Sequence, residues 1–197
     1  MMKSQPVSPD VRTRILETAW RLIGERNDAS ISLLDVAREA GVSRQTVYVN
    51  FRSRAGLLLA MVQHRDATAD ELGRMKRGAD NPAAKDALQA FIKGWFKYVP
   101  VVFHVSRALQ AAAVSDHDAK LAWNSRMDLL RAGVQGLMQR LRAEGLLAKG
   151  WTTEAATDWC YHLIHVDSWQ HLVVERNWTP AEVAQRTWET IDAMLIR

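Results

Sequence analysis

Polar side chains cluster in the short segment Arg44-Gln45-Thr46-Val47-Tyr48, which begins directly after Ser43. The segment has the length of a short helix, and its exposed face would carry hydrogen-bonding groups. Such a face suits the major groove of DNA, where base edges present donors and acceptors that differ between base pairs. Arg44 and Gln45 have no apolar partner in the pattern, which argues against a purely structural role. The chemistry indicated is recognition of base edges, not bond making or breaking.

The residues before this segment are suited to hold it in place. Ser32 and Asp35 have the spacing of a capping box, with Asp35 in the place of the usual Glu. Gly41 permits the left-handed backbone of a tight turn, and Ser43 can cap the helix that follows. Ala37 and Ala40 are small enough for two helices to cross closely, while Val42 and Val47 can fill the space beneath them. Two short capped helices joined by a glycine turn predict a helix-turn-helix.

Charge is distributed unevenly along the 197 residues, whose formal net charge is +4. Residues 1–65 hold 10 Lys and Arg against 6 Asp and Glu, and the remainder holds 16 of each. A localised basic surface is typical of a face that binds nucleic acid, although an accident of surface composition would look the same. The single cysteine, Cys160, excludes an internal disulfide. We find no apolar run near the ~20 residues of a membrane span and no secretory signal, so we expect a cytoplasmic protein without a membrane partner.

Helical spacing of apolar residues recurs throughout, and no strand-like alternation of any length is present. We therefore predict an all-α fold of about nine helices. The expected division is a helix-turn-helix DNA-binding domain at 1–60 and a helical ligand-binding and dimerisation domain at 61–197, with a long linking helix at about 53–75. Lys76–Pro82 reads as a loop, and Pro100 as the end of one helix. Further helices are expected at 101–114, 119–144 and 153–176, and the last one follows the capping box Thr179–Glu182.

The segment from about Arg12 to Leu59 resembles the DNA-binding domain of the TetR family of transcriptional regulators. The matching residues are Ile15-Leu16, Ala19, Asp35-Val36-Ala37, Ala40-Gly41-Val42-Ser43, Thr46-Val47-Tyr48, Phe51, Arg54 and Gly56-Leu57-Leu58. The resemblance implies base contacts by Arg44, Gln45 and Thr46. It also implies contacts to the DNA backbone by Ser32, Ser43, Tyr48, Asn50 and Arg54, with the Tyr48 ring also bracing the domain. The sequence departs from the family pattern at Val49-Asn50 and at Gln45, which puts the strength and closeness of binding in doubt.

The resemblance further implies a homodimer that binds a palindromic operator in double-stranded DNA and is released by a small effector. We expect a hydrophobic or aromatic effector, because aromatic residues could line an apolar pocket: Trp95, Phe96, Phe103, Trp123, Met127 and Trp159, with His162. Plain core packing is the alternative for each of them. The expected dimer interface lies on the last two helices: Leu163, Val166, Trp169, Val183, Trp188, Ile191 and Leu195.

Asp158, His162 and His165 have a spacing that could present ligands to zinc from one helix. No fourth ligand is evident, so we favour polar roles in an interface or pocket and expect no metal or cofactor. Two alternatives to an effector-controlled repressor stay open. One is a regulator without a small-molecule ligand, controlled by a protein or acting as an activator. The other is a helical enzyme, which the absence of a nucleophile–base pair or phosphate loop disfavours.

Overall fold

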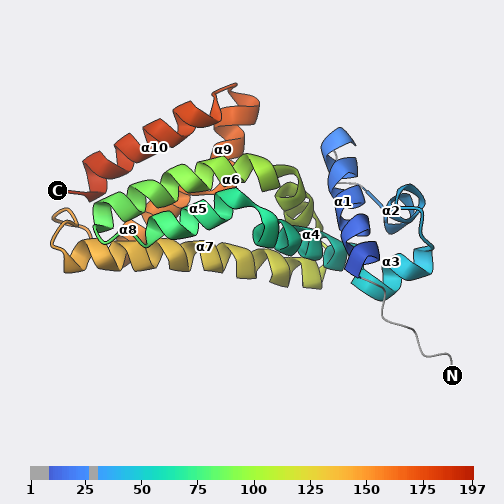
Figure 1. Cartoon of the computed structure of the whole chain (residues 1–197). Helices are drawn as coiled ribbons and strands as arrows, with labels where there is room; N and C mark the ends of the chain where they lie inside the picture. The colour runs from blue at the N-terminus through green and yellow to red at the C-terminus, as the bar shows by residue number, and fades with distance from the viewer. Residues whose placement is uncertain (1–8, 27–30) are drawn as a thin grey trace. The chain divides into compact units, whose positions relative to one another are not determined.

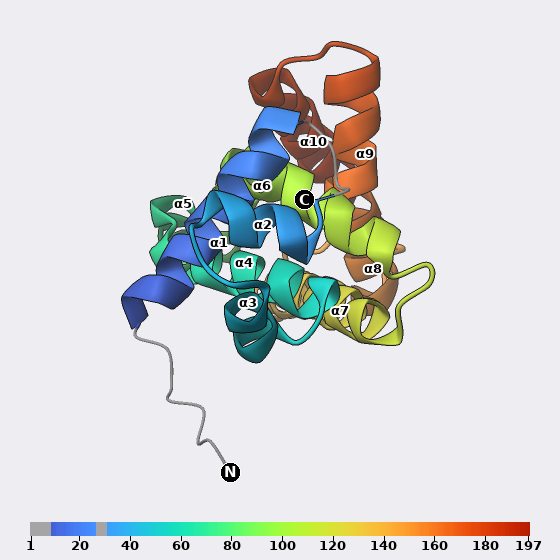
Figure 2. The same ribbon diagram turned by 90° about the vertical axis from the view of Figure 1, so that its right-hand side faces the viewer.

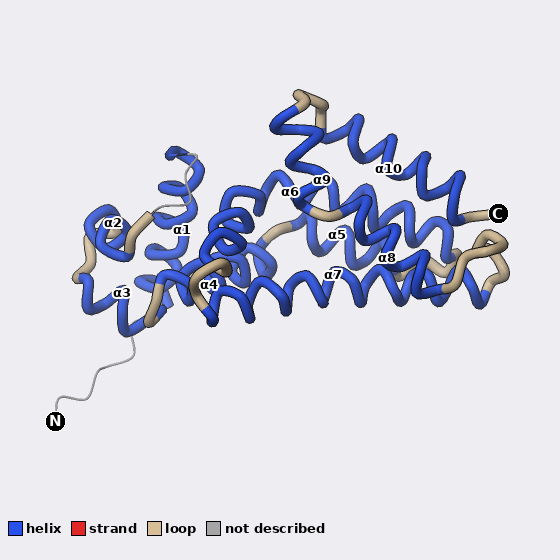
Figure 3. Tube along the Cα trace, turned by 180° about the vertical axis from the view of Figure 1, so that it is seen from behind, coloured by secondary structure: helices blue, strands red, loops and turns tan. Residues whose placement is uncertain are grey.

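A computed structural model describes residues 9–26 and 31–197, and these residues are almost entirely helical (Figures 1 and 3). The elements are α1 (Pro9–Arg26), α2 (Leu33–Glu39), α3 (Arg44–Phe51), α4 (Arg54–Thr68), α5 (Asp70–Ala79), α6 (Ala84–Ala112), α7 (His117–Ala143), α8 (Thr153–Ile164), α9 (Val166–Gln170), the π-helical η1 (His171–Glu175) and α10 (Pro180–Leu195). The prediction of an all-α fold is confirmed. Within the described part of the chain, no helix is both long and apolar enough to cross a membrane.

The chain divides into two compact units, and both α6 and α7 contribute to each of them. The N-terminal unit contains the described residues of 1–68 together with 102–125, and the C-terminal unit contains 69–101 and 126–197. The predicted functional boundary near residue 60 stays a prediction.

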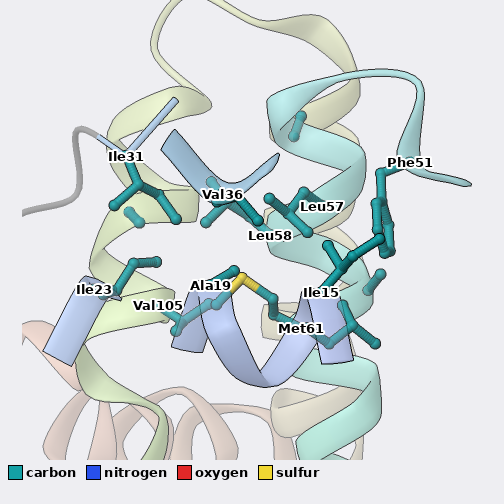
Figure 4. Packing of buried hydrophobic residues seen from close by; sticks show 14 of the residues in the cluster. Ile15, Ala19, Ile23, Ile31, Val36, Phe51, Leu57, Leu58, Met61 and Val105 are labelled. Carbon is teal, nitrogen blue, oxygen red and sulfur yellow. The ribbon is translucent and has the colours of Figure 1, made fainter. Parts of the chain in front are cut away.

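The core of the N-terminal unit joins the first four helices to the second half of α6. In this unit α1 packs on α2 and α4, and α3 packs on the same two helices (Figure 2). Figure 4 shows Ile15 and Ala19 of α1, Val36 of α2, Met61 of α4 and Val105 of α6 meeting in one buried cluster. Each is at most 2% exposed. Burial of these side chains provides the main stabilisation of the short helices α2 and α3, which would be marginal in isolation.

Pro100 lies inside α6, so the prediction that a helix ends there is wrong. Proline removes one backbone hydrogen bond and disfavours a helix interior by about 3 kcal/mol. Apolar side chains on both sides of the proline are buried, among them Phe96, Val99 and Val102. Because full burial of one such side chain contributes about 1.5–3 kcal/mol, packing of the two flanking turns outweighs the proline penalty.

The predicted linking helix at 53–75 is also wrong, because it is divided into α4 and α5. Ala69 has extended backbone angles, φ −79° and ψ 119°, and precedes the first residue of α5. No proline or glycine marks this break in the sequence. Asp70 begins the next helix, where a carboxylate favours the positive end of the helix dipole. Residues 76–79, expected in a loop, belong to the last turn of α5.

The stretch predicted as one helix at 153–176 is interrupted at His165. This residue ends α8 and begins α9, with φ −60° and ψ 145°. Its ring nitrogen Nδ1 accepts a hydrogen bond from the amide of Asp167 at 3.3 Å. The side chain therefore caps α9 and provides an acceptor for an amide that the break leaves unpaired.

Contacts from α7 hold the start of α6 in the C-terminal unit. Glu144 lies just past the end of α7, and its two carboxylate oxygens accept from the backbone amide of Ala84 at 3.0 and 3.1 Å. Arg140 donates to the carbonyl of Ala79 at 2.7 Å and also to that of Asn81. In the same α7–α8 connection, the backbone of Ala148 donates to the Leu195 carbonyl at 2.9 Å, which ties the C-terminus to this loop.

Candidate nucleic-acid interface

The predicted capping box at the start of α2 is present. The Ser32 hydroxyl accepts from the amide of Asp35 at 3.1 Å, and the Ser32 amide donates to the Asp35 carboxylate at 3.2 Å. The Ser32 hydroxyl also donates to that carboxylate at 2.7 Å. Ser32 is therefore fixed at the helix start, where a DNA phosphate would meet backbone amides.

The turn that joins α2 to α3 has the geometry expected from its sequence. Gly41 has φ +63°, in the left-handed region that favours glycine. Ser43 then caps α3 by accepting from the Thr46 amide at 3.0 Å, and the two hydroxyl oxygens lie 2.8 Å apart. Thr46 is half-buried, so its hydroxyl first stabilises the start of α3.

One face of α3 is exposed and carries the residues predicted to read DNA. Arg44, Gln45, Tyr48 and Val49 are exposed, whereas Val47 is fully buried. Among the described residues, neither Arg44 nor Gln45 has a hydrogen-bond or ion-pair partner. The geometry therefore leaves their donors and acceptors available to a partner molecule.

Tyr48 and Asn50 differ in how they sit on α3. Tyr48 is 56% exposed, so its ring contributes little to bracing the domain, and that part of the expectation is wrong. Phe51, at 4% exposed, has the structural role. The side-chain amide of Asn50 donates to the Thr46 carbonyl at 2.8 Å, one turn earlier in α3. Its predicted phosphate contact would use the second hydrogen of the same NH₂ group.

Arg12 of α1 holds the end of α3, a role that the sequence analysis missed. Its guanidinium donates to the Asn50 carbonyl at 3.1 Å and lies 4.7 Å from the centroid of the Phe51 ring. A cation at a helix C-terminus also interacts favourably with the helix dipole. Because Arg12 and Asn50 are 38 residues apart, no local pattern could have indicated this contact.

The α3–α4 connection is tight, and Gly56 makes it possible. Arg52 has φ +61°, and the amide of Ser53 donates back to the Phe51 carbonyl at 2.6 Å, which closes a three-residue turn. The Ser53 hydroxyl accepts from the Gly56 amide at 3.0 Å. A Cβ atom at Gly56 would lie 2.1 Å from the Phe51 carbonyl oxygen, closer than any real contact. The turn fixes where α3 lies relative to α4.

Arg54 is half-buried, and its Nε donates to the Ile31 carbonyl at 2.9 Å, immediately before the α2 cap. The side chain therefore supports the start of α2, and its remaining nitrogens could still meet a phosphate. The surrounding charge favours an anionic partner: residues 40–65 contain four arginines and no acidic residue. This uncompensated charge would attract the phosphate backbone of DNA.

The residues predicted to line an effector pocket are divided between the two units. Phe103 and Trp123 belong to the N-terminal unit, and the other five belong to the C-terminal unit. Trp95 is buried and uses its indole N–H to donate to the Ile164 carbonyl at 2.7 Å, which is a structural role. Trp159 is 39% exposed and contacts the exposed His162 in a tilted ring pair, with ring centroids 5.8 Å apart. These two side chains therefore lie at the surface of α8. Met127 is half-buried, and Phe96 borders a groove described below.

The predicted dimer interface needs a correction, because most of its residues pack inside the protomer. Val166, Trp169, Val183, Ile191 and Leu195 are each at most 5% exposed in a single chain. They cannot meet a partner while the protomer keeps this packing. The helical spacing identified the apolar rows correctly. The rows predicted to contact a second protomer, however, face the core of their own protomer. Leu163 and Trp188 are half-buried. The exposed large apolar residues near the C-terminus are instead Trp159, Val174, Trp178 and Met194.

The residues weighed as zinc ligands have other partners. The Asp158 carboxylate accepts from Arg131 at 2.6 and 3.0 Å. His165 caps α9, and burial lowers its pKa, against the opposing effect of nearby Asp167. Within the described ranges, we find no group of three acidic, histidine or cysteine side chains placed to hold a metal ion. Cys160 is fully buried, which raises the pKa of its thiol to about 12.

Comparison with known proteins places the helix-turn-helix in a family. Residues 15–61 match the model for bacterial regulatory proteins of the tetR family. The chain is 32% identical over 127 residues to the HTH-type transcriptional regulator EthR of Mycobacterium tuberculosis, an alignment that covers 63% of this chain and 58% of EthR. The chain thus spans less than two thirds of the length of that relative.

Solved structures share the fold along nearly the whole chain. A Saccharomonospora viridis protein in complex with choline aligns with a TM-score of 0.80 and 18% identity, covering 96% of this chain and all of that one. NalD, the secondary repressor of the MexAB-OprM multidrug efflux pump in Pseudomonas aeruginosa, aligns with a TM-score of 0.66 and 23% identity, covering 95% of this chain and 96% of NalD. The family match and the similarity to EthR agree, and the helix-turn-helix of this chain is one of the TetR family of bacterial regulators, while the all-α architecture is shared along nearly the whole chain.

Proposed function

We propose that this protein is a transcriptional regulator that binds a specific DNA sequence through α3. The observation that carries the proposal is the exposed face of α3, where Arg44 and Gln45 have no partner among the described residues. The opposite face is fixed by the buried side chains of Val47 and Phe51. An arginine can donate two hydrogen bonds to guanine, and a glutamine can pair with adenine. Ser32, Ser43, Tyr48, Asn50 and Arg54 would position the domain on the phosphates.

Selection of bound sequences from a random DNA pool tests this proposal, followed by the variant Arg44→Ala. Loss of a base contact should lower the preference for the selected sequence by about 1–3 kcal/mol, roughly 5- to 150-fold, and leave non-specific affinity nearly unchanged. Arg14→Ala is the matched control, because Arg14 is an exposed arginine on α1. No enriched sequence at low salt would refute the proposal. An equal fall in affinity for all sequences would make Arg44 a phosphate contact instead.

We propose further that the protein acts as a homodimer on a palindromic operator. One short recognition helix reads only a few base pairs, whereas two helices about 34–36 Å apart reach successive major grooves. The exposed Trp159, Val174, Trp178 and Met194 near the C-terminus support a partner surface in this region. Sedimentation of Trp159→Ser and Trp178→Ser variants tests this surface. An unchanged dimer in both variants would exclude the two tryptophans from the interface.

The regulator we propose is a repressor that releases DNA when a small molecule binds. Two solved structures with the same fold support this reading, one in complex with choline and one described as a repressor. An effector would act by favouring a conformation in which two recognition helices no longer match the operator. A screen for compounds that release the selected DNA tests the idea. We propose no catalytic role for this protein. Its cytoplasmic location stays a prediction.

A further inference from the structure

A groove of about 960 Å³ opens on the surface of the C-terminal unit. One wall comes from α6 and the other from α10, and Arg74 of α5 lies at its edge. Sites for small molecules commonly have volumes of about 300–1,000 Å³, so the groove is large enough for one. Only Phe96 was expected on sequence grounds to border a ligand site.

The wall from α6 combines cations with an apolar strip. Lys93 and Lys97 are exposed, lie one helical turn apart and face the groove. Within the described residues, neither ammonium group has a hydrogen-bond or ion-pair partner. Pro100 is exposed beside them and gives the same wall an apolar surface, whereas Phe96, which also borders the groove, is only 2% exposed. The wall can therefore contact an apolar body and an anionic group at the same time.

The wall from α10 is formed by small residues followed by a large aromatic one. Ala181 and Ala184 are small residues in this wall, and the half-buried Trp188 lines it as well. The Trp188 indole N–H has no hydrogen-bond partner in the described part of the chain, so it remains a donor. Three donors thus surround an apolar floor.

The acidic residue that borders the groove is already engaged on its own helix. Glu189 accepts from Gln185 at 2.9 Å and from Arg186 at 2.7 Å, and these contacts lower the pKa of its carboxyl group. Its charge is thus largely balanced by Arg186. The charge that remains unbalanced in the groove is positive and comes from Lys93 and Lys97.

We infer that this groove binds a small amphipathic organic anion, whose apolar body lies on Pro100, Ala184 and Trp188 and whose carboxylate or sulfonate meets Lys93 and Lys97. The complementarity is specific in both parts: a neutral apolar molecule would leave the cations unused, and a small inorganic anion would leave the apolar floor exposed. That such binding releases DNA rests on the proposed function, but the binding itself does not.

Two fluorescent probes with one aromatic body test the site in the full chain without DNA. Anilinonaphthalene sulfonate carries the anionic group, and N-phenylnaphthylamine lacks it. The variant Lys93→Gln with Lys97→Gln should weaken binding of the sulfonate about tenfold and binding of the neutral probe less than twofold. The control Lys76→Gln with Lys149→Gln removes the same charge from exposed lysines that do not line the groove and should leave both affinities unchanged. Ala184→Phe should fill the groove and weaken both probes.

Equal sulfonate affinity in the Lys93/Lys97 variant and its control would overturn the inference, as would unchanged binding of both probes to Ala184→Phe. A third result would also overturn the inference: the wild type binds neither probe, and Ala184→Phe sediments as a monomer where the wild type sediments as a dimer. The groove would then be a contact surface for a second copy of the chain. Binding of the selected DNA is measured separately for each variant without a probe. Failure of DNA binding would refute the proposed function alone, and failure of the probe pattern would refute the groove alone.

Discussion

Substitution of Gly56 by alanine tests whether the α3–α4 turn fixes the recognition helix. The new Cβ would lie 2.1 Å from the Phe51 carbonyl oxygen, and ordinary contact begins at 3.4 Å. The two atoms must therefore separate by about 1.3 Å. The obstacle is backbone, and Phe51 is the last residue of α3, so the strain cannot be relieved by rotating a flexible side chain.

The expected effect follows from two opposing contributions. Overpacking of a tight site destabilises a protein by about 1–3 kcal/mol. Replacing glycine by alanine in a helix returns at most about 1 kcal/mol. We expect Gly56→Ala to lower the free energy of unfolding by about 1–2 kcal/mol. For a chain of this size, that corresponds to a fall in Tm of about 2–8 °C.

Gly24→Ala provides the matched control, because Gly24 lies in α1 of the same unit and a Cβ there would meet nothing within 4 Å. We expect it to be neutral or to stabilise the protein by up to ~1 kcal/mol. Both variants are compared by urea and thermal unfolding at one protein concentration, because dimerisation makes stability depend on concentration. Affinity for the selected DNA is measured at a temperature where both variants are folded. If Gly56→Ala matches Gly24→Ala in stability and in DNA affinity, the proposed constraint on α3 is refuted.

Three other contacts give shorter predictions. Arg12→Ala should lower the free energy of unfolding by about 1–2 kcal/mol and weaken binding of the selected DNA, because the cation that contacts the Asn50 carbonyl and the Phe51 ring is removed. Urea unfolding and DNA titration measure the two effects, and Arg12→Lys should restore only part of the stability and affinity. Because burial lowers the His165 pKa, the folded state binds fewer protons than the unfolded state. Stability should fall as the pH drops below ~6.5, and His165→Asn, which keeps a capping acceptor, should lose less between pH 7 and 5.5 in thermal melts. Glu144→Ala should destabilise the protein by about 1 kcal/mol and speed hydrogen exchange at the start of α6, whereas Glu144→Gln should have a smaller effect.

The helix-turn-helix could be predicted from sequence because its signals are local. The Ser32–Asp35 capping box and the glycine turn at Gly41 each depend on residues within a few positions of one another. The exposed face of α3 follows from the positions of Val47 and Phe51, since a helix that buries these residues must expose Gln45 and Val49 on its opposite side. Arg44 lies three residues before Val47, and its exposure in the first turn of α3 does not follow from this period. The fold class followed in the same way, from spacing alone.

The errors arose where tertiary packing overrides a local signal. Pro100 reads as a helix end, but burial on both sides carries α6 through it. Ala69 gives no local warning, yet the helix is interrupted there. The apolar rows of α8–α10 were identified, but periodicity cannot tell whether a row faces its own core or a second protomer. The contacts of Arg12 and Arg54 join residues 38 and 23 positions apart, so no local motif encodes them.

One element connects the two functions that we propose. The first part of α6, up to Pro100, forms a wall of the groove, and its second part carries Val105 into the buried core beneath α1 and α4. Pro100 cannot donate to the Phe96 carbonyl, so α6 lacks one backbone hydrogen bond at the point where the chain passes from one unit to the other. A ligand on Pro100 would contact α6 at the turn that lacks this hydrogen bond. Under the proposed function, α6 therefore belongs both to the groove and to the core that supports α3. A ligand that binds one state of α6 more tightly than another would favour that state, and the core would transmit the change to the recognition helix.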